Sequence, residues 1–436
     1  MVEKIAEMTR DTIAEDPDRW AFLLRLRYQV AFGGMIAIIA PAIIISLLFN
    51  VPLDLSANYN TVIGGFVALL LGNISYRKLQ IFPGITSGGY IFTSFSIAFA
   101  ALATALILLR LDFSRVQFLV SWVLTVSYFT YVHLRFIARR EIVLGVIPGG
   151  ATNRLPLVPR ATWYRFSDPD ELVPRLAGVV ADLRADHSPA WNSRIASFVL
   201  NGTPVYHVKE AIEQLSGRVE VEHLSENTLG SLNPNDFYIK VKATIDGVIA
   251  FTALLMLAPA LLLVAFLIRL DSPGPALFRQ QRVGFRARPF TVYKFRTMMQ
   301  PTLTGAADDS RSKAMTQPND PRITRLGSFL RKTRIDELPQ LINIIRGEMS
   351  LIGPRPEALP LSQWYEQEIP FYHYRHIIKP GVTGWAQVNQ GHVTDVNDVR
   401  EKLHLDFYYV KNFSFWLDIL ITLRTAQTIV TGHGAR

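Results

Sequence analysis

The stretch Val248–Ile268, VIAFTALLMLAPALLLVAFLI, contains no Asp, Glu, Lys or Arg and carries Pro259 near its centre. A run of this length can cross the hydrocarbon core of a bilayer as one helix. A proline inside a helix removes a backbone hydrogen bond and kinks the helix. Two topologies are open: a plain kinked span, and a re-entrant element that returns to the side it entered. We expect a re-entrant helix over 237–270, broken at Pro259, because a fifth crossing would move the following polar residues out of the cytoplasm.

Four further windows without Asp, Glu, Lys or Arg lie upstream: Tyr28–Leu53, Tyr59–Tyr76, Leu79–Leu109 (after Lys78) and Val116–Leu134. Each supplies about the 20 apolar residues that a spanning helix needs. They predict four transmembrane helices, near 29–49, 60–76, 89–109 and 116–134, within a membrane unit over 28–135. The segment 1–27 is polar, shows no cleavable signal peptide and is expected in the cytosol.

The basic residues outside these windows indicate the orientation of the chain. They are Lys4, Arg10, Arg19, Arg25 and Arg27 before the first helix, Arg77 and Lys78 after the second, and Arg135, Arg139 and Arg140 after the fourth. The positive-inside rule therefore places the N-terminus, the second loop and everything after residue 135 in the cytoplasm. The net charge of +9 fits this bias together with attraction to anionic lipid. The basic residues are dispersed and no nucleic-acid motif is present, so no nucleic-acid partner is expected.

Residues 136–236 alternate between strand and helix patterns, which predicts a Rossmann-like α/β module in the cytosol. Glu141–Gly150 reads as a strand, and Pro169–Leu183 and Glu210–Gly217 read as helices. The fragment Gly145-x-x-x-Gly149-Gly150 is not a complete dinucleotide fingerprint, so it is either a structural turn or a ligand site. A linker rich in Asn, Ser, Gly and Pro follows over Ser225–Asp236.

Residues 271–436 hold most of the groups suited to chemistry. Pro289–Met298 reads as a strand in which Lys294 and Arg296 share one face by alternation. Two cations on one face suit a diphosphate, although a solvated strand face is the alternative. The chain contains no cysteine, which excludes disulfides, thiolate catalysis and Cys-ligated metals.

The densest group of charges is Arg331–Pro356, RKTRIDELPQLINIIRGEMSLIGPRP. Asp336 and Glu337 precede Pro339, which suits a first helical turn, so both carboxylates lie near a helix N-terminus. One carboxylate can attack phosphorus or hold Mg²⁺, while Arg331 and Arg355 neutralise phosphate oxygens. The alternative is that the acidic pair only caps the helix.

Four motifs give the chain a family resemblance: KFRTM (294–298), DELPQLINIIRGEMSLIGPRP (336–356), KPGVTGWAQVN (379–389) and DFYY (406–409). Together they resemble the bacterial sugar transferase family, the polyprenyl-phosphate hexose-1-phosphate transferases or monotopic phosphoglycosyl transferases. The resemblance implies a mainly α catalytic domain over 271–436 at the membrane surface, after a re-entrant helix. This sequence differs from the family pattern at the break of that helix: the family often has Ser-Pro there, and this chain has Ala258-Pro259.

The resemblance also implies a two-step reaction. Asp336 would attack the β-phosphate of a UDP-sugar and release UMP, and undecaprenyl phosphate would then accept the sugar-phosphate. Glu337 would be the Mg²⁺ or acid–base partner, with both carboxylates as candidate ligands of Mg²⁺. The other positions matching the family are Arg331, Arg355, Lys294 and Arg296, expected to bind substrate phosphate, and Asp406 and Gln340, further polar site candidates.

The implied partners are a UDP-sugar, polyprenyl phosphate and membrane lipid, at the cytoplasmic face of a bacterial inner membrane. A homodimer and polysaccharide assembly proteins are further partners that the large family members suggest. A competing hypothesis is a non-catalytic scaffold of polysaccharide assembly. A third, a flippase for lipid-linked sugar, predicts charged residues inside the spans, and the four windows contain none.

Overall fold

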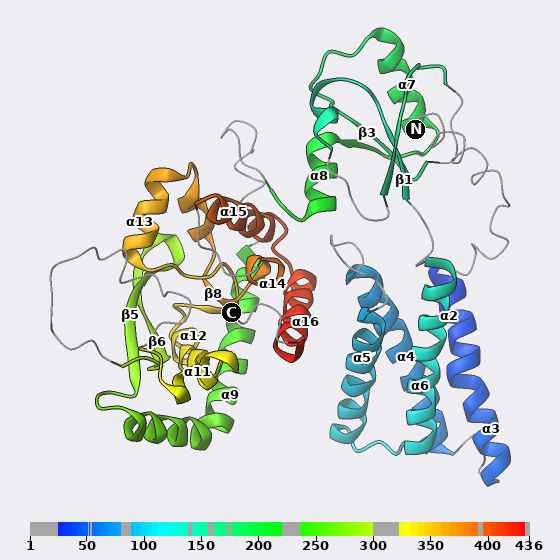
Figure 1. Ribbon diagram of the computed structural model, residues 1–436. Coiled ribbons are helices and arrows are strands. Elements are labelled where there is room, and N and C mark those ends of the chain that lie inside the picture. Colours follow the sequence, from blue (N-terminus) through cyan, green and yellow to red (C-terminus); the bar gives the residue numbers. More distant parts are fainter. Residues whose placement is uncertain are drawn as a thin grey trace. The chain divides into compact units, whose positions relative to one another are not determined.

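The structure, a computed structural model, describes ten stretches of the chain: residues 25–50, 52, 55–79, 89–137, 142–155, 161–171, 176–219, 236–299, 322–390 and 396–431. The chain divides into two compact units, Met1–Gly217 and Arg218–Arg436. Figure 1 shows their elements, and each unit is treated by itself. Nearly all of the predicted N-terminal segment 1–27 and of the linker Ser225–Asp236 lies outside the described residues.

The first unit begins with the four helices that the charge-free windows predict. The first is formed by α2 (Leu26–Gly34), a π-helical turn (Met35–Ile39) and α3 (Ala40–Phe49), and it is followed by α4 (Ser56–Leu79), α5 (Gly89–Leu108) and α6 (Arg115–Val132). Among the described residues, four helices are long and apolar enough to cross a membrane: Leu26–Phe49, Ser56–Leu79, Tyr90–Leu108 and Phe237–Asp271. Helix α6 is not one of these, but it packs against α4 and α5 in the bundle.

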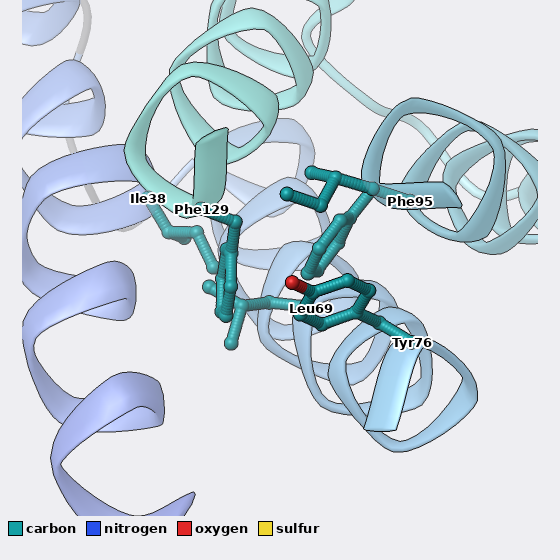
Figure 2. Packing of buried hydrophobic residues seen from close by; sticks show 6 residues of the cluster. Ile38, Leu69, Tyr76, Phe95 and Phe129 are labelled. Carbon is teal, nitrogen blue, oxygen red and sulfur yellow. The ribbon is translucent and has the colours of Figure 1, made fainter. Parts of the chain in front are cut away.

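Aromatic side chains fill the centre of the bundle. Figure 2 shows Ile38, Leu69, Tyr76, Phe95 and Phe129 meeting between the helices, and all five are buried. A side chain at Gly72 of α4 would place its Cβ 2.4 Å from the ring of Phe95. Since helices in lipid associate through close packing, this glycine lets α4 and α5 approach each other.

A four-stranded parallel sheet follows in the same unit. Its order is β2 (Ala161–Arg165), β1 (Ile142–Val146), β3 (Gly178–Ala181) and β4 (Val205–His207). Two helices, α7 (Pro189–Leu200) and α8 (Val208–Ser216), follow β3 and β4. The predicted α/β module and its helix at 210–217 are therefore present.

The prediction of a helix over Pro169–Leu183 is wrong, because its C-terminal half is strand β3. All four residues of β3 are buried. A strand covered on both faces reads as a continuous apolar run, which periodicity alone does not separate from a helix. Helix α7 was not predicted, although Ser188 caps it and Pro189 begins it, a recognisable start signal.

The glycine turn after β1 is closed by the protein itself. Ligands of such sheets bind at the carboxyl ends of strands where the order reverses, here between β1 and β3. Asp182, directly after β3, accepts a hydrogen bond from the backbone N–H of Ala151 at 2.8 Å. A Cβ on Gly150, whose φ is +57°, would lie 2.1 Å from that carboxylate oxygen. The Asp182 carboxylate thus takes the place that an anion would occupy, and Gly149-Gly150 serves as a structural turn.

The second unit consists of α9, two small sheets and short helices. The elements are α9 (Asp236–Asp271), β5 (Leu277–Val283), β6 (Pro289–Phe295), α11 (Arg325–Lys332), a 3₁₀ turn η6 (Ile335–Gln340), α12 (Leu341–Ile345), β7 (Ser350–Ile352), α13 (Leu359–Glu368), a 3₁₀ turn η7 (Tyr372–Ile377), β8 (Gly381–Thr383), α14 (Trp385–Asn389), α15 (Val396–Lys411) and α16 (Phe415–Thr431). Strands β5 and β6 form an antiparallel hairpin, and β7 and β8 pair in parallel. The mainly α character agrees with the prediction.

Helix α9 is one continuous helix with Pro259 inside it, and Figure 1 shows that its two parts run in different directions. The predicted break is therefore a bend, which a proline explains. Near its start, the Lys242 ammonium lies 2.9 Å from the Asp418 carboxylate. Beyond its end, the Arg296 guanidinium donates to the carbonyl of Pro273 at 2.9 Å. Both ends of α9 are thus held by the same compact unit.

Candidate active site

The two adjacent carboxylates lie in a short 3₁₀ turn between α11 and α12. Asp336 and Glu337 form the first turn of η6, and Pro339 lies within it. Arg334, just before the turn, has a left-handed backbone with φ +60°. Both carboxylates are buried, at 9% and 7% exposure, so their charges depend on the groups around them.

Glu337 is held by three cations. Its Oε1 accepts from the Lys294 ammonium at 2.9 Å and from the Arg355 guanidinium at 2.7 Å. Its Oε2 lies 3.5 Å from Arg334. Burial alone would raise the pKa of Glu337, but Arg355 and Lys294 outweigh it and hold this pKa well below the ordinary value. Glu337 is therefore a fixed carboxylate that stays ionised.

Asp336 has the opposite environment. Its Oδ1 is buried and has no hydrogen-bond partner among the described residues. Burial and the neighbouring charge of Glu337 raise its pKa, although Lys294, Arg331 and Arg355 act against this. A carboxylate with a free oxygen and a raised pKa is the more basic and more nucleophilic of the two.

A small pocket lies beside Glu337. Lys294 comes from β6 and Arg355 from the proline-flanked segment after β7, and the pocket is also lined by Arg282 and Gln340. Burial and the charge of Arg355 lower the pKa of Lys294 to about 8, despite its contact with Glu337. The structure therefore brings together five of the predicted site residues: Lys294, Arg355, Gln340 and both carboxylates.

Arg331 lies at the edge of this group. Its Nε donates to the Thr297 hydroxyl at 2.8 Å, and its charge acts to lower the pKa of Asp336. In the described part of the chain, no carboxylate lies within 4.0 Å of its guanidinium.

Arg296 lies elsewhere, which corrects its expected place beside Lys294. Strand β6 ends at Phe295, so the alternation of side chains does not extend to Arg296. Its guanidinium donates to the carbonyls of Ile268, Ser272 and Pro273. A cation at this position satisfies carbonyls that a helix leaves unpaired at its C-terminus. The structure thus gives Arg296 the role of a cap on α9.

Asp406 also lies away from the pocket. It forms a buried ion pair with Arg375, whose guanidinium nitrogen is 2.7 Å away, and the two side chains are 1% and 2% exposed. Arg375 donates in turn to the carbonyl of Arg355 at 2.9 Å. Asp406 is therefore linked to the site through Arg375 and the carbonyl of Arg355.

Three charged residues near the site were not predicted: Arg282, Arg334 and Glu357. Arg334 could have been found from its spacing, since it precedes Glu337 by three residues and such pairs meet on a helical turn. Arg282 and Glu357 carry no local signal, because tertiary packing brings them beside Arg355 and Arg375.

Two oxygens are available for a metal ion. They are Oδ1 of Asp336, which has no partner in the described part of the chain, and Oε2 of Glu337, whose nearest cation is 3.5 Å away. The described residues contain no cluster of three or more His, Asp or Glu. Mg²⁺ is commonly bound by one or two carboxylates together with substrate phosphates, so this pair fits such a site.

Comparison with known proteins identifies the family. The sequence profile of the bacterial sugar transferases matches residues 237–432. A UDP-N-acetylgalactosamine-undecaprenyl-phosphate N-acetylgalactosaminephosphotransferase from Aeromonas hydrophila is 42% identical over 381 residues, covering 86% of this chain and 88% of that protein. The chain belongs to the bacterial sugar transferase family. The predicted resemblance is confirmed, and this transferase is a membrane enzyme of the phosphoglycosyl transferase type.

Other relatives of the transferase share a smaller part of it. A UDP-glucose:undecaprenyl-phosphate glucose-1-phosphate transferase from Xanthomonas campestris pv. campestris is 38% identical over 225 residues, which is 51% of this chain and 45% of that protein. The exopolysaccharide production protein PSS from Rhizobium leguminosarum bv. phaseoli is 44% identical over 196 residues, 44% of this chain and 96% of that protein. The matched part of the transferase therefore makes up nearly the whole of one relative.

The low pKa of Lys294 predicts a pH dependence. Above pH about 8 Lys294 loses its charge, so kcat/KM, which reports the free enzyme, should fall on the alkaline side. Below the raised pKa of Asp336 the carboxylate gains a proton, so kcat/KM should also fall on the acidic side. In Lys294→Arg the alkaline fall should move beyond pH 10, since the guanidinium of arginine stays charged up to pH ~12. The measurement is kcat/KM from pH 4 to 10.

Lys332→Arg is the matched control, because Lys332 is exposed on α11. It should keep the wild-type profile. An unchanged alkaline fall in Lys294→Arg would assign that titration to another group.

Proposed function

We propose that this transferase moves a sugar-1-phosphate from a UDP-sugar to undecaprenyl phosphate through a covalent aspartyl intermediate. An Asp336 carboxylate oxygen forms a bond to the β-phosphorus, and the bond from that phosphorus to the bridging oxygen breaks, so UMP leaves. An oxygen of undecaprenyl phosphate then attacks the same phosphorus. The aspartyl–phosphorus bond breaks, which restores Asp336 and yields undecaprenyl diphosphate sugar.

The contrast between the two carboxylates supports Asp336 as the nucleophile. A nucleophile needs a lone pair that no donor holds, and Oδ1 of Asp336 has no hydrogen-bond partner among the described residues. Oε1 of Glu337 accepts from both Lys294 and Arg355, so two cations hold Glu337 in place. This single observation carries the assignment of the roles.

The cations around Glu337 suit the charge of a diphosphate. Lys294 and Arg355 already lie within 3 Å of a carboxylate, and both line the pocket. Fixed cations stabilise charge that develops on phosphate oxygens without needing to reorganise. Mg²⁺ would be held by Asp336 and Glu337 and would offset the charge of the leaving UMP.

The exposed face of α9 supports a membrane location for the site. Its most exposed large apolar side chains are Phe237 (76%), Met256 (76%), Leu262 (72%), Leu255 (68%) and Leu270 (68%). Since both ends of the bent helix are tied to one unit, we propose that α9 enters the inner membrane and returns to the cytoplasmic face. A re-entrant helix would bring a soluble nucleotide sugar and a lipid phosphate to one interfacial site.

The names of the relatives suggest which UDP-sugar should be tested first as the donor. The Aeromonas hydrophila relative, which aligns over 86% of this chain, is named for N-acetylgalactosamine. The Xanthomonas campestris relative, which aligns over 51%, is named for glucose. We therefore propose a UDP-N-acetylhexosamine as the first donor to test. The homodimer and the assembly partners stay predictions.

The test is UMP release by the purified full chain with Mg²⁺ and undecaprenyl phosphate, across a panel of UDP-sugars. Release with one sugar that depends on the lipid is the expected result. The same assay without Mg²⁺ tests the metal. If the folded wild-type protein fails to release UMP with every UDP-sugar of the panel, the proposed transfer is refuted for these donors.

A further inference from the structure

The segment that carries Arg355 has few regular backbone partners. Pro354 and Pro356 flank Arg355, and neither proline has a backbone N–H. The segment lies between β7 and α13 and belongs to no strand or helix. Buried carbonyls in such a segment must find donors elsewhere.

Two of these carbonyls are held by guanidinium groups from distant elements. Arg375 of η7 donates to the carbonyl of Arg355 at 2.9 Å. Arg282, next to last in β5, donates to the carbonyl of Pro356. The carbonyls on either side, of Pro354 and Glu357, accept from the backbone N–H groups of Gly381 and Val283. Each carbonyl from 354 to 357 therefore has a donor.

Arg282 is itself fixed in place. Its Nε and one terminal nitrogen donate to the Gln280 side-chain oxygen at 3.2 Å and 2.9 Å. Its backbone bridges to Ala358. The Arg282 guanidinium is thus held by the Gln280 side chain and by the Pro356 carbonyl. In this position it lines the pocket together with Lys294 and Arg355.

We propose that Arg282 is a positioning residue for the transfer reaction: it fixes the backbone that carries Arg355 and adds a further positive charge to the diphosphate pocket. This inference rests on the proposed function for its role in turnover. Arg282 lines this pocket together with Lys294 and Arg355. Its removal should therefore weaken the binding of a diphosphate.

The test compares Arg282→Gln, Arg282→Lys and Arg279→Gln in the purified full chain. Arg279 lies on the same strand and is exposed, with its guanidinium over the ring of Tyr293, so Arg279→Gln is the matched control. We expect kcat to fall about 10- to 100-fold in Arg282→Gln, as displaced catalytic groups typically cause. Arg282→Lys should show a smaller fall, and Arg279→Gln should stay within about twofold of wild type.

A second readout does not depend on turnover. The Kd of UDP for the purified full chain should rise about tenfold in Arg282→Gln, because the pocket loses one positive charge. It should stay at the wild-type value in Arg282→Lys and in Arg279→Gln, which keep the charge of residue 282. If Arg282→Gln fails to fold, Arg282→Lys tests the positioning alone through its fall in kcat.

Either of two results would overturn the proposal: kcat within twofold of wild type in both Arg282 variants, or a lowered melting temperature with the Kd of UDP unchanged in Arg282→Gln. The second result would make Arg282 a merely structural residue. Wild-type protein without UMP release would instead refute the proposed function. The Kd of UDP would still decide whether Arg282 adds charge to the diphosphate pocket.

Discussion

Replacing Asp336 by Asn should lower the rate of sugar-phosphate transfer by about 10⁴-fold or more, the size of loss seen when a covalent nucleophile is removed. The amide keeps the shape of the side chain but has no carboxylate lone pair to attack phosphorus. Because Oδ1 of Asp336 has no partner among the described residues, the change should leave the melting temperature near that of wild type. The measurement is UMP release with the donor identified in the panel.

Glu366→Gln is the charge-matched control, since Glu366 is an exposed carboxylate on α13. It should keep the wild-type rate. A second measurement uses wild-type enzyme with UDP-sugar and no lipid acceptor: the peptide containing Asp336 should gain the mass of one sugar-phosphate. Adduct formation on the Glu337 side chain in place of Asp336 would reverse the roles proposed for the two carboxylates.

Replacing Asp406 by Asn should destabilise the second unit by about 3–5 kcal/mol, the range measured when one partner of a buried ion pair is removed. The carboxylate and the Arg375 guanidinium are almost fully buried and lie 2.7 Å apart. Without Asp406, the nearest carboxylate to Arg375 is Glu357 at 4.0 Å. The apparent melting temperature of the full chain, measured at one scan rate, should fall by more than about 5 °C.

Glu401 offers a contrast on the same helix. It pairs with Arg218 at 2.6 Å, but both side chains are about half exposed, at 43% and 52%. Exposed pairs contribute about 0–1 kcal/mol, so Glu401→Gln should change the melting temperature little. The double variant Asp406→Leu/Arg375→Met should lose less stability than the sum of its single changes. If Asp406→Asn stops transfer with no loss of stability, Asp406 belongs to the chemistry rather than to the fold.

Much of the site could be predicted because its groups are close in the chain. Asp336 and Glu337 are adjacent, and Arg355 lies 18 residues after Glu337 in one continuous motif. The predicted strand and the KFRTM motif both indicate Lys294 as a site residue. Its ammonium contacts Glu337, which lies 43 residues later in the chain. Arg296 was misplaced, because alternation along a strand predicts a shared face only up to the last strand residue, Phe295.

Other features had no local signal. The charges of Arg282, Glu357 and Arg375 meet because β5, the segment after β7 and η7 pack together. Strand β3 was predicted as helix, since a strand buried on both faces lacks the alternation that marks a half-buried strand. The sequence allows the glycines at 149–150 to be a structural turn or a ligand site, and only the contact with Asp182, more than 30 residues later, decides between them.

The sequence by itself determined the apolar helices, their order before an α/β module and a mainly α unit, the family, and the adjacent carboxylates for which we propose the chemistry. These follow from apolar length, charge placement and short motifs, which are properties of neighbouring residues. Only the tertiary structure decided that Glu337 is fixed by cations while Asp336 keeps a free oxygen, and that Arg296 and Asp406 lie outside the pocket. The reason is that hydrogen bonds and ion pairs between buried charges depend on which distant elements pack together.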